Sequence, residues 1–452
     1  MQNGNENNEM FYEKLKEAVD RDDITTFRDG LNELHPYDQA QFFFSQDEET
    51  RMKMYRYLSP AEMADLFENV EDEEREAFIS EMDPSYAADM LGEMYADDAV
   101  DVLNELEAEQ VASYLTLMED ESSKEIRELL HYEEETAGSI MTTEFVAIRE
   151  YETVGQAMSI LKKEAPEAET IYYVFVVDEE KRLTGVISLR DLIIADDDTL
   201  IKEILNERVV SISVGADQEE AAKIMRDYDF LALPVVDFQN HLLGIITVDD
   251  IVDVIDEEAS EDYSKFAAMS DVEVNQNPFA AAKKRLPWLI ILLFLGMVTA
   301  TLIGHFQSTL NQVAILAAFI PVISGTSGNS GTQALAVVVR GIATGDFDSL
   351  SRFKLFIQEM GTGLIIGAAC GLTLSLIVYF LKGELYLGMI VGFSLMCSLF
   401  VATLAGAFVP LIMHKLKVDP AVASGPFIST ISDLISMMIY FSIATAFMNY
   451  LT

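Results

Sequence analysis

The chain has 452 residues and a formal net charge of −46, from 76 acidic and 30 basic residues. Its length predicts two to four domains. The excess acid lies in residues 1–285, with 70 acids against 24 bases, whereas residues 286–452 contain six of each. So acidic a region repels nucleic acid and anionic lipid head groups and attracts cations. The two cysteines, Cys370 and Cys397, are too few for a disulfide framework or a zinc site.

Residues 1 to about 135 are expected to form a small helical solenoid. The polar, charged residues 1–30 contain no secretory signal, so the amino terminus is expected in the cytoplasm. Leu58–Leu66, Met82–Leu91 and Ala96–Leu103 repeat one pattern, in which Ser, Pro or Asp begins a run of apolar residues at helical spacing. The repeats carry no catalytic signature, and their default role is protein packing.

Residues 137–262 contain two copies of one strand–helix–strand–strand–helix unit. In copy one, strands are expected at Phe145–Ile148, Ile171–Asp178 and Leu183–Leu189, and the first helix at Val154–Lys163. In copy two, strands are expected at Val209–Ser213, Ala232–Asp237 and Leu242–Val248, and the first helix at Gln218–Asp227. In both copies Val-Val-Asp precedes a last strand of related sequence, Leu-Thr-Gly-Val-Ile-Ser or Leu-Leu-Gly-Ile-Ile-Thr. This order and these segments resemble a pair of CBS domains.

The resemblance to CBS domains implies that the pair can bind an adenine nucleotide such as ATP in a regulatory role. Asp191, after the last strand of the first copy, would hold the ribose. Arg190 would lie near phosphate, and Tyr173 near the base. A dimerisation module without a ligand is the alternative, and the residues leave both readings open.

A dense run of acids follows the second copy. Asp250, Asp253, Glu257 and Glu261 lie three or four residues apart, so one helical face carries them all. Like charges at this spacing destabilise an isolated helix, and a bound divalent ion would relieve the repulsion. The spacing of an EF-hand loop is absent. A metal site is one interpretation of this face, and a solvated acidic surface is the other.

Five apolar stretches after residue 285 are each about long enough to cross the hydrocarbon core of a bilayer. They are Leu286–Gly304, Val313–Val339, Leu355–Leu381, Leu385–Met413 and Ala421–Leu451. Basic residues precede the first stretch and fill the second and fourth loops. This distribution places the amino-terminal region inside the cell and the carboxyl terminus outside.

The second stretch contains a polar, glycine-rich run, Pro321–Gln333, that is unusual for a helix facing lipid. Such a run is tolerated where protein or water covers the backbone. Asn329 and Gln333 lie four residues apart on one helical face, which favours a pore lining. Close helix packing through small residues is the alternative.

Asp433 lies in the fifth stretch, by helix rise roughly 18 Å beyond Ala421. A charge in lipid costs about 2.5–3.5 kcal/mol by the lower estimates, so it normally faces a water-filled path or a partner. No Lys or Arg occurs at matching depth, which disfavours a buried ion pair. Pro426 is expected to kink or loosen the first turns of this helix. Glu359, nearer a span end, is expected to reach the interface.

A carboxylate at this depth suits Mg²⁺, a hard cation that prefers oxygen and gives up water reluctantly. A pore needs acceptors for the hydrated ion and a modest charge, because an ion held too tightly does not leave. If two subunits each place one Asp433 on a shared axis, the pair balances a divalent ion. The charge alone does not separate magnesium from calcium or manganese.

These parts, in this order, resemble the MgtE family of magnesium channels and transporters over nearly the whole chain. The most specific motifs are Gly-Asn-Ser-Gly-Thr-Gln within Pro321–Gln333, and the series from Asp419-Pro-Ala through Gly-Pro-Phe to Ser-Asp433. The implied fold is a multidomain membrane protein. Its parts would be an N-terminal α-helical superhelical domain (1–135), an α+β CBS-domain pair (136–262), a connecting plug helix (263–284) and a five-helix transmembrane domain (285–452).

The resemblance implies a homodimer in the cell membrane that takes up Mg²⁺ and serves magnesium homeostasis. In the family, the aspartate matching Asp433 recognises hydrated magnesium in the pore. The residues that the motifs single out for the pore are Gly328, Asn329, Gly331, Gln333, Pro420, Gly425 and Asp433.

The resemblance also implies a feedback gate, in which Mg²⁺ bound among the N-terminal domain, the CBS pair and the plug helix closes the pore. When internal Mg²⁺ falls, repulsion between acidic surfaces would separate the domains and allow opening. The implied metal ligands are Asp97 and Asp101 facing Asp250, then Asp253, Glu258, Glu261 and Asp262 near the plug, Asp419 from the membrane part, and Glu219, Asp229 and the carbonyl of Gly138.

Other classes of protein remain as alternatives. An enzyme or an ATP-driven pump is disfavoured, because the chain has five histidines and lacks a Walker lysine, a nucleophile elbow and a metal-protease pair. A transporter of other divalent cations, such as Mn²⁺ or Co²⁺, fits the same charge. A membrane-anchored nucleotide or metal sensor would not need a polar second stretch or a mid-membrane aspartate.

Overall fold

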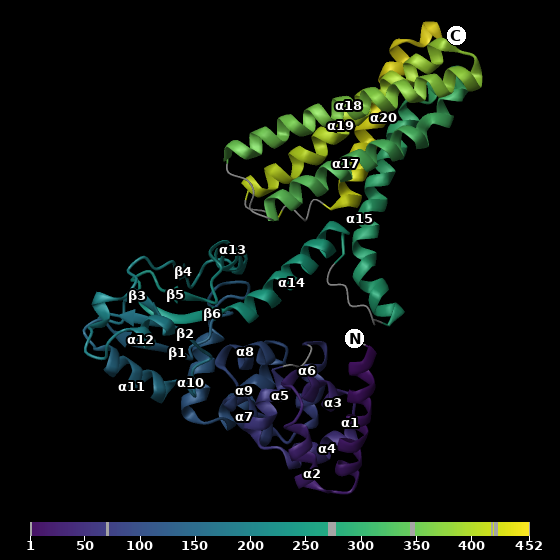
Figure 1. Ribbon diagram of the computed structural model, residues 1–452. Coiled ribbons are helices and arrows are strands. Elements are labelled where there is room, and N and C mark those ends of the chain that lie inside the picture. Colours follow the sequence, from purple (N-terminus) through teal and green to yellow (C-terminus); the bar gives the residue numbers. More distant parts are fainter. Residues whose placement is uncertain are drawn as a thin grey trace. The chain divides into compact units, whose positions relative to one another are not determined.

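The computed structural model describes residues 2–68, 72–269, 277–343, 349–416, 419 and 424–451. The chain divides into two compact units, Met1–Ile255 and Asp256–Thr452. Figure 1 labels the helices and strands of both units.

The first unit opens with a series of short helices, as the repeats predicted. They are α1 (Gln2–Asp20), α2 (Ile24–Leu31), α3 (Pro36–Phe44), α4 (Glu48–Tyr57), α5 (Pro60–Phe67), α6 (Asp72–Glu81), α7 (Pro84–Glu93), α8 (Ala96–Asn104), α9 (Ala108–Leu117) and α10 (Asp120–Leu129).

The helix starts coincide with the residues that predicted them. Ser59 and Glu62 form a capping box at the start of α5, where Pro60 occupies the first turn. Asp83 caps α7 through its side chain, with Pro84 behind it. The helical character predicted for this region is therefore confirmed.

Two three-stranded sheets follow, one from each copy of the repeat. Their strands are β1 (Phe145–Arg149), β2 (Thr170–Val177) and β3 (Leu183–Ser188) in the first sheet, and β4 (Ile212–Ser213), β5 (Ala232–Val236) and β6 (Leu242–Thr247) in the second. In each sheet the first strand pairs parallel with the second, and the third pairs antiparallel with the second. The predicted duplication is confirmed.

The helices of the repeat lie where the sequence placed them. They are α11 (Val154–Glu164) and α13 (Gln218–Tyr228), with α12 (Leu189–Ile194) and the 3-10 turn η1 (Ile201–Glu203) after β3. The strand predicted at Val209–Ser213 is shorter than expected, because its last two residues alone pair with β5.

Three apolar clusters hold the first unit together. The largest joins the short helices to the second CBS copy, since Leu103 shares it with Leu233. The first copy has its own core around Val176, and a third cluster between the two sheets brings Phe175 together with Ile245. The helical region therefore packs against the second copy of the repeat.

The helix α14 (Val248–Phe266) follows directly on β6 and runs from the first unit into the second. It carries the acidic run that the sequence places after the second copy. The segment 263–284 contains the end of α14, then residues 270–276, which lie outside the described residues, and then the first turns of α15 (Pro278–His305).

The second unit is a bundle of long helices. Besides α15 its elements are α16 (Gln307–Gln312), η2 (Ala314–Phe319), α17 (Ile320–Ala343), α18 (Ser349–Lys382), α19 (Leu385–Lys415), α20 (Gly425–Ala446) and η4 (Met448–Tyr450). Helix α19 packs against α17, α18 and α20, and these helices run side by side (Figure 1). Glycines permit the close approach: a Cβ on Gly367 of α18 would lie 2.7 Å from the Met396 carbonyl oxygen of α19.

Four described helices are long and apolar enough to cross a membrane. They are Ala281–His305, Phe353–Lys382, Leu385–Lys415 and Gly425–Ala446. The remaining long helix of the bundle, α17, carries the polar run and does not fall in this group. The sequence predicted five spans, and the crossing of the membrane by α17 remains a prediction.

The structure differs from the prediction in two spans. The span expected at Val313–Val339 begins instead as the 3-10 turn η2, and α17 starts at Ile320 and continues to Ala343. In α20, Pro426 occupies the first turn. Backbone N–H groups in a first turn have no partner within the helix, so proline removes no helical hydrogen bond there and the expected kink does not arise.

Two acids were placed by their distance along a span. Asp433 lies about 12 Å along α20 from Gly425, where the helix begins, and the expected distance from Ala421 involves residues that lie outside the described ones. The Glu359 side chain is 7% exposed within the bundle, so the expectation that it reaches the interface is wrong. Residues 420–423, Pro420 among them, lie outside the described residues.

Candidate functional site

Asp433 lies on α20 where this helix packs against α17. Its Oδ1 atom is buried and has no hydrogen-bond partner among the described residues, while the Ser324 side chain of α17 lies beside the carboxylate. A Cβ on Gly328 would lie 3.4 Å from Oδ1 and 2.5 Å from the Ser429 hydroxyl. Glycine at position 328 therefore lets the α17 backbone approach a carboxylate that still has acceptor capacity to offer a ligand.

Small side chains continue this contact along α17. A Cβ on Gly331 would lie 2.6 Å from the Ser432 hydroxyl of α20. The hydroxyls of Ser330 and Thr403 lie 2.8 Å apart and join α17 to α19. On this side of α17, close packing through small residues is the role of the polar run.

The amide side chains of the polar run lie elsewhere on α17. Asn329 and Gln333 are exposed, as is Gly325 one turn earlier. Small residues of the run thus face α19 and α20, whereas the amides are exposed, and the pore lining remains a prediction.

Seven carboxylates gather in the first unit where the short helices meet the two CBS copies. We call this group the first-unit acidic cluster; its members are Glu68, Asp97, Asp98, Glu144, Glu169, Asp249 and Asp250. Carboxylate oxygens of Glu169, Asp249 and Asp250 lie within 4.8 Å of one another, close enough to share a metal ion.

Asp97 is the most buried member of the first-unit acidic cluster. Its side chain, on α8, is 6% exposed, and its Oδ1 atom has no hydrogen-bond partner in the described part of the chain. Burial and then the charge of Asp250 raise the pKa of Asp97 well above its ordinary value. The two residues that the resemblance pairs across this boundary therefore lie close enough to repel each other.

The other acids of the cluster are shifted in the same direction. Burial is the largest cause in each case, and it acts with neighbouring acids to raise the pKa of Asp98 to about 6, of Glu68 and Asp250 to about 7, and of Glu169 to about 8. Arg75 partly offsets the rise at Asp98, and a hydrogen bond from Thr247 partly offsets it at Asp250. Excess negative charge in a partly dry site is the condition that favours a divalent cation.

Two further predicted ligands flank this cluster. Asp101 is exposed on α8, one turn after Asp97. Asp253 is exposed on α14, one turn after Asp250, and its charge contributes to the raised pKa of Asp98.

The three remaining predicted ligands of the first unit lie around α13. Glu219 is in its first turn, and Asp229 ends it in the left-handed conformation with φ of 54°. The N–H of Gly138 donates to the Val214 carbonyl, and a Cβ there would lie 2.7 Å from the Val214 side chain. Within the described ranges, the structure brings none of the three into a carboxylate group close enough to hold a metal.

A second group of acids lies in the second unit, at the end of α14. The second-unit acidic cluster consists of Glu258, Glu261, Asp262 and Asp419. Burial and then the charge of Asp419 raise the pKa of Asp262, and Glu258 and Glu261 add to the rise. Four predicted ligands are therefore near one another here.

One basic residue lies among these acids. The Lys265 Nζ is 2.6 Å from the Glu261 Oε1 and 2.8 Å from the Asp419 Oδ2. Burial opposes its charged form, but hydrogen bonds to Asp419 and Glu261 prevail and raise the pKa of Lys265.

The predicted nucleotide residues lie at one end of the first sheet. Tyr173 of β2 pairs with Ser188 of β3. The Ser188 hydroxyl donates to the Asp191 carboxylate at 2.6 Å and accepts the Asp191 N–H at 3.2 Å, which starts α12. Arg190 is exposed beside them. The three residues thus lie near the same end of this sheet.

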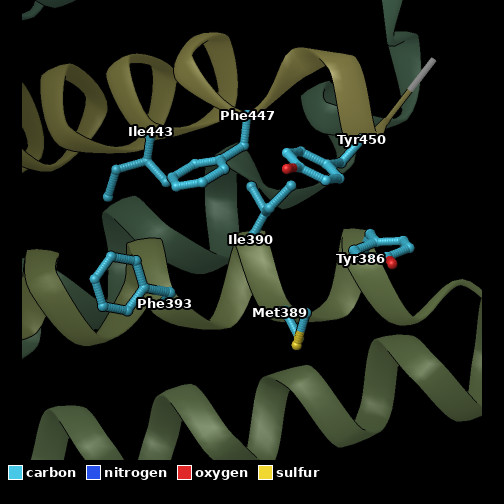
Figure 2. A pocket seen from close by; sticks show the side chains of 7 residues that line it. All are labelled: Tyr386, Met389, Ile390, Phe393, Ile443, Phe447 and Tyr450. Carbon is cyan, nitrogen blue, oxygen red and sulfur yellow. The ribbon is translucent and has the colours of Figure 1, made fainter.

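An apolar hollow of about 260 Å³ lies between α19 and the end of α20 (Figure 2). Its lining residues are Tyr386, Met389, Ile390, Phe393, Ile443, Phe447 and Tyr450. Because none of these side chains carries a charge, the hollow does not provide the oxygen ligands that a divalent cation requires.

Sequence reasoning missed residues of these sites, among them Ser324, Glu169 and Lys265. Ser324 belongs to the polar run, but its position relative to Asp433 depends on how α17 packs on α20. Glu169 precedes β2 without any periodic signal, and its neighbours come from α8 and α14. Lys265 follows Glu261 by four residues, so that ion pair was readable from the sequence.

Relatives with known names resemble the chain over its full length. "Magnesium transporter MgtE" of Enterococcus faecalis is 54% identical over 100% of both chains. The chain belongs to the MgtE family. The proteins of the same name from Bacillus subtilis and Thermus thermophilus are 42% and 39% identical, each over 95% of this chain and at least 95% of their own length.

The family models divide the chain as the fold does. The MgtE intracellular N domain matches residues 34–135, the CBS domain matches 137–198 and 201–257, and the MgtE divalent cation transporter model matches 320–443. The MgtE assignment, with several apolar helices, makes this a multi-pass membrane protein of a transporter family.

Two solved structures resemble the soluble part of this MgtE chain. The soluble part of a magnesium transporter is 57% identical with a TM-score of 0.55, and covers 56% of this chain and 99% of its own. The cytosolic domain of the Mg²⁺ channel MgtE in complex with ATP is 39% identical with a TM-score of 0.51, and covers 54% and 99%. Such a soluble part was thus crystallised without its membrane region.

The first-unit acidic cluster predicts how the stability of a fragment of residues 1–269 depends on pH. Carboxyls whose folded pKa is raised bind protons more tightly when folded, so their contribution is fully present below the unfolded pKa of about 4. That contribution is lost as the pH rises through the folded values of about 6 to 8. In EDTA, the Tm measured by calorimetry should therefore fall between pH 5 and pH 8, and millimolar Mg²⁺ should restore it.

The variant Asp97→Asn should flatten this pH dependence, because it removes one buried charge from the cluster. Glu109→Gln, which changes an exposed acid on α9, is the matched control and should keep the wild-type slope. A Tm that is level between pH 5 and pH 8 in EDTA would contradict the assignment of repulsion to this cluster.

Proposed function

We propose that the chain is a Mg²⁺-selective channel or transporter that takes up magnesium across the cell membrane and closes when Mg²⁺ binds its acidic clusters. The observation that carries the proposal is the buried, unpartnered Oδ1 of Asp433 beside Gly328, in a family whose named relatives are magnesium transporters. A carboxylate in this position provides charge and acceptors to an ion that keeps its water.

The transport path is proposed to lie between two copies of the chain. Asn329 and Gln333 face away from the chain's own helices, and among the described residues of α15 no apolar side chain is fully buried. A homodimer would cover both surfaces and would bring two Asp433 carboxylates together, enough to balance one divalent ion. In this arrangement α17 also crosses the membrane, as the second of five spans in chain order, because a polar helix face needs protein or water beside it.

The proposed orientation places both acidic clusters in the cytoplasm. The basic residues before the first span and in the even loops favour the inside, and five spans then leave the carboxyl terminus outside. Mg²⁺ that enters through the bundle would therefore reach both acidic clusters in the cytoplasm, which is what feedback control requires.

Closure is proposed to follow from charge neutralisation. Buried acids such as Asp97 and Asp250 repel one another, and bound Mg²⁺ would remove that repulsion and hold the helical region, the CBS pair and α14 together. The segment around the end of α14 and residues 263–284 is proposed as the plug. Loss of Mg²⁺ would restore repulsion and weaken the contacts that hold it in place.

Other divalent cations are the alternative cargo. Mn²⁺ and Co²⁺ carry the same charge as Mg²⁺, and the carboxylate alone does not exclude them. The names of the three full-length relatives favour magnesium.

The central test compares Mg²⁺ flux into liposomes for wild type, Asp433→Asn and Asp433→Ala. Both variants remove the charge, and each should lower flux by about tenfold or more, equivalent to 1.4 kcal/mol of lost ion stabilisation. Ser324→Ala, which removes a hydroxyl beside the carboxylate but keeps the charge, should have a smaller effect. The matched control is Glu384→Gln, an exposed acid at the start of α19 that should leave flux unchanged. Wild-type flux through Asp433→Asn would refute the assigned path.

ATP is proposed as a regulatory ligand of the CBS pair. The solved relative in complex with ATP supports this, as does the position of Tyr173, Arg190 and Asp191 near one end of the sheet. Calorimetric titration of the full chain should show ATP binding about tenfold weaker in Asp191→Ala, from the loss of ribose hydrogen bonds to a charged acceptor. Glu179→Ala, an exposed acid in the turn before β3, is the control. Equal affinities in both variants and wild type would place the nucleotide elsewhere or nowhere.

A further inference from the structure

The end of α14 is fastened to the membrane bundle by two adjacent residues of different character. Lys265 forms ion pairs with Glu261, one turn earlier on α14, and with Asp419, which precedes α20. Phe266 packs against the bundle as part of an apolar cluster that includes Leu335 of α17 and Ile428 of α20.

The apolar half of this contact lies against Gly425. A Cβ on Gly425 would lie 3.5 Å from the Phe266 carbonyl oxygen and 3.7 Å from its ring, so the last turn of α14 rests directly on the first turn of α20. The helix α20 also carries Asp433. Movement of this end of α14 is therefore coupled to the start of the helix that holds the proposed ion site.

The ionic half of the contact has the form of a cation bridge. The Lys265 ammonium lies 2.6 and 2.8 Å from carboxylate oxygens on two different segments, which is the place that an ion binding both segments would take. Four acids, Glu258, Glu261, Asp262 and Asp419, surround this one positive charge. A divalent ion at this place would bring twice the positive charge of the ammonium to the same carboxylates.

We propose that Lys265 is a tethered cation that holds the end of α14 on the bundle when no divalent ion is bound there, and that an incoming Mg²⁺ displaces its ammonium. This proposal rests on the proposed magnesium gate and adds how the gate behaves in the ion's absence. The four-carbon stem of lysine lets the ammonium swing away without moving the helix. The ion-free contact is then weakened, not absent, and Mg²⁺ strengthens a contact that already exists.

The first test is hydrogen exchange of the full chain in detergent, followed in the peptide from Asp262 to Met269. The amides of Ala267, Ala268 and Met269 bond to carbonyls of Tyr263, Lys265 and Ser264, so they report opening of this end. In EDTA, Lys265→Met should raise the exchange rate of these amides about fivefold, because a partly exposed ion pair contributes about 1 kcal/mol, which corresponds to a factor of about five. Saturating Mg²⁺ should return the variant to the wild-type rate.

Two control variants accompany this test. Lys265→Arg keeps the charge and should behave as wild type in EDTA. Lys163→Met removes an exposed lysine of α11 in the other unit and should change nothing in this peptide. Equal protection of Lys265→Met and wild type in EDTA would overturn the proposed holding role.

The second test uses wild-type protein, so it does not depend on a variant folding. Mass spectrometry measures the acetylation rate of the Lys265 side chain with and without Mg²⁺, with Lys163 as the internal reference. Displacement predicts faster labelling of Lys265 when Mg²⁺ is present. Unchanged or slower labelling would overturn displacement.

Neither test uses ion flux, so their outcome is separate from the flux test of Asp433. Loss of flux in Asp433→Asn together with unchanged exchange in Lys265→Met would leave the transport proposal intact and reject the tethered cation. Unchanged flux in Asp433→Asn together with faster exchange in Lys265→Met would support the Lys265 contact and reject the ion path at Asp433.

Discussion

Asp433 and Asp97 each place a carboxylate where little water reaches it and where the described residues give one of its oxygens no hydrogen-bond donor. An ionised carboxylate in such a place is costly unless a cation or a donor compensates it. The fold of each unit determines how that cost is met. In the bundle, glycines of α17 bring backbone and a serine hydroxyl to Asp433. In the first unit, further acids approach Asp97, which increases the demand for a cation.

The two acidic settings differ in how firmly they would hold an ion. Glu169, Asp249 and Asp250 bring oxygens within 4.8 Å of one another, which suits a site that retains a metal. Asp433 offers one carboxylate per chain against serines and glycines, which suits an ion that must leave. The same hard-ion chemistry can thus serve sensing in one unit and passage in the other, because the number of carboxylates differs.

The sequence predicted those features that depend on local pattern. Ser59-Pro60 and Asp83-Pro84 predicted helix starts, the repeated Val-Val-Asp segments predicted two similar sheets, and the depth of Asp433 singled out one helix. What it could not predict depends on packing. Glu169 joins Asp250 because β2 and α14 meet in the folded unit, and Ser324 reaches Asp433 because Gly328 permits close contact.

Errors in the prediction have the same origin. Apolar composition extended the second span back to Val313, but the chain forms a 3-10 turn before α17. Hydropathy gives no signal for a change of helix type, since both stretches are apolar. Glu359 was placed by its distance from the span end, whereas its exposure is decided by the neighbouring helices of the bundle.

The central claim is that one chain both passes Mg²⁺ and closes in response to it. The most direct measurement is the current through the full chain in a planar bilayer, with Mg²⁺ as the sole permeant cation and the free Mg²⁺ on the soluble-domain side varied. The account predicts Mg²⁺ current at low free Mg²⁺ on that side, declining as the concentration rises. Absence of Mg²⁺ current under every condition, or a current that does not decline, would contradict it.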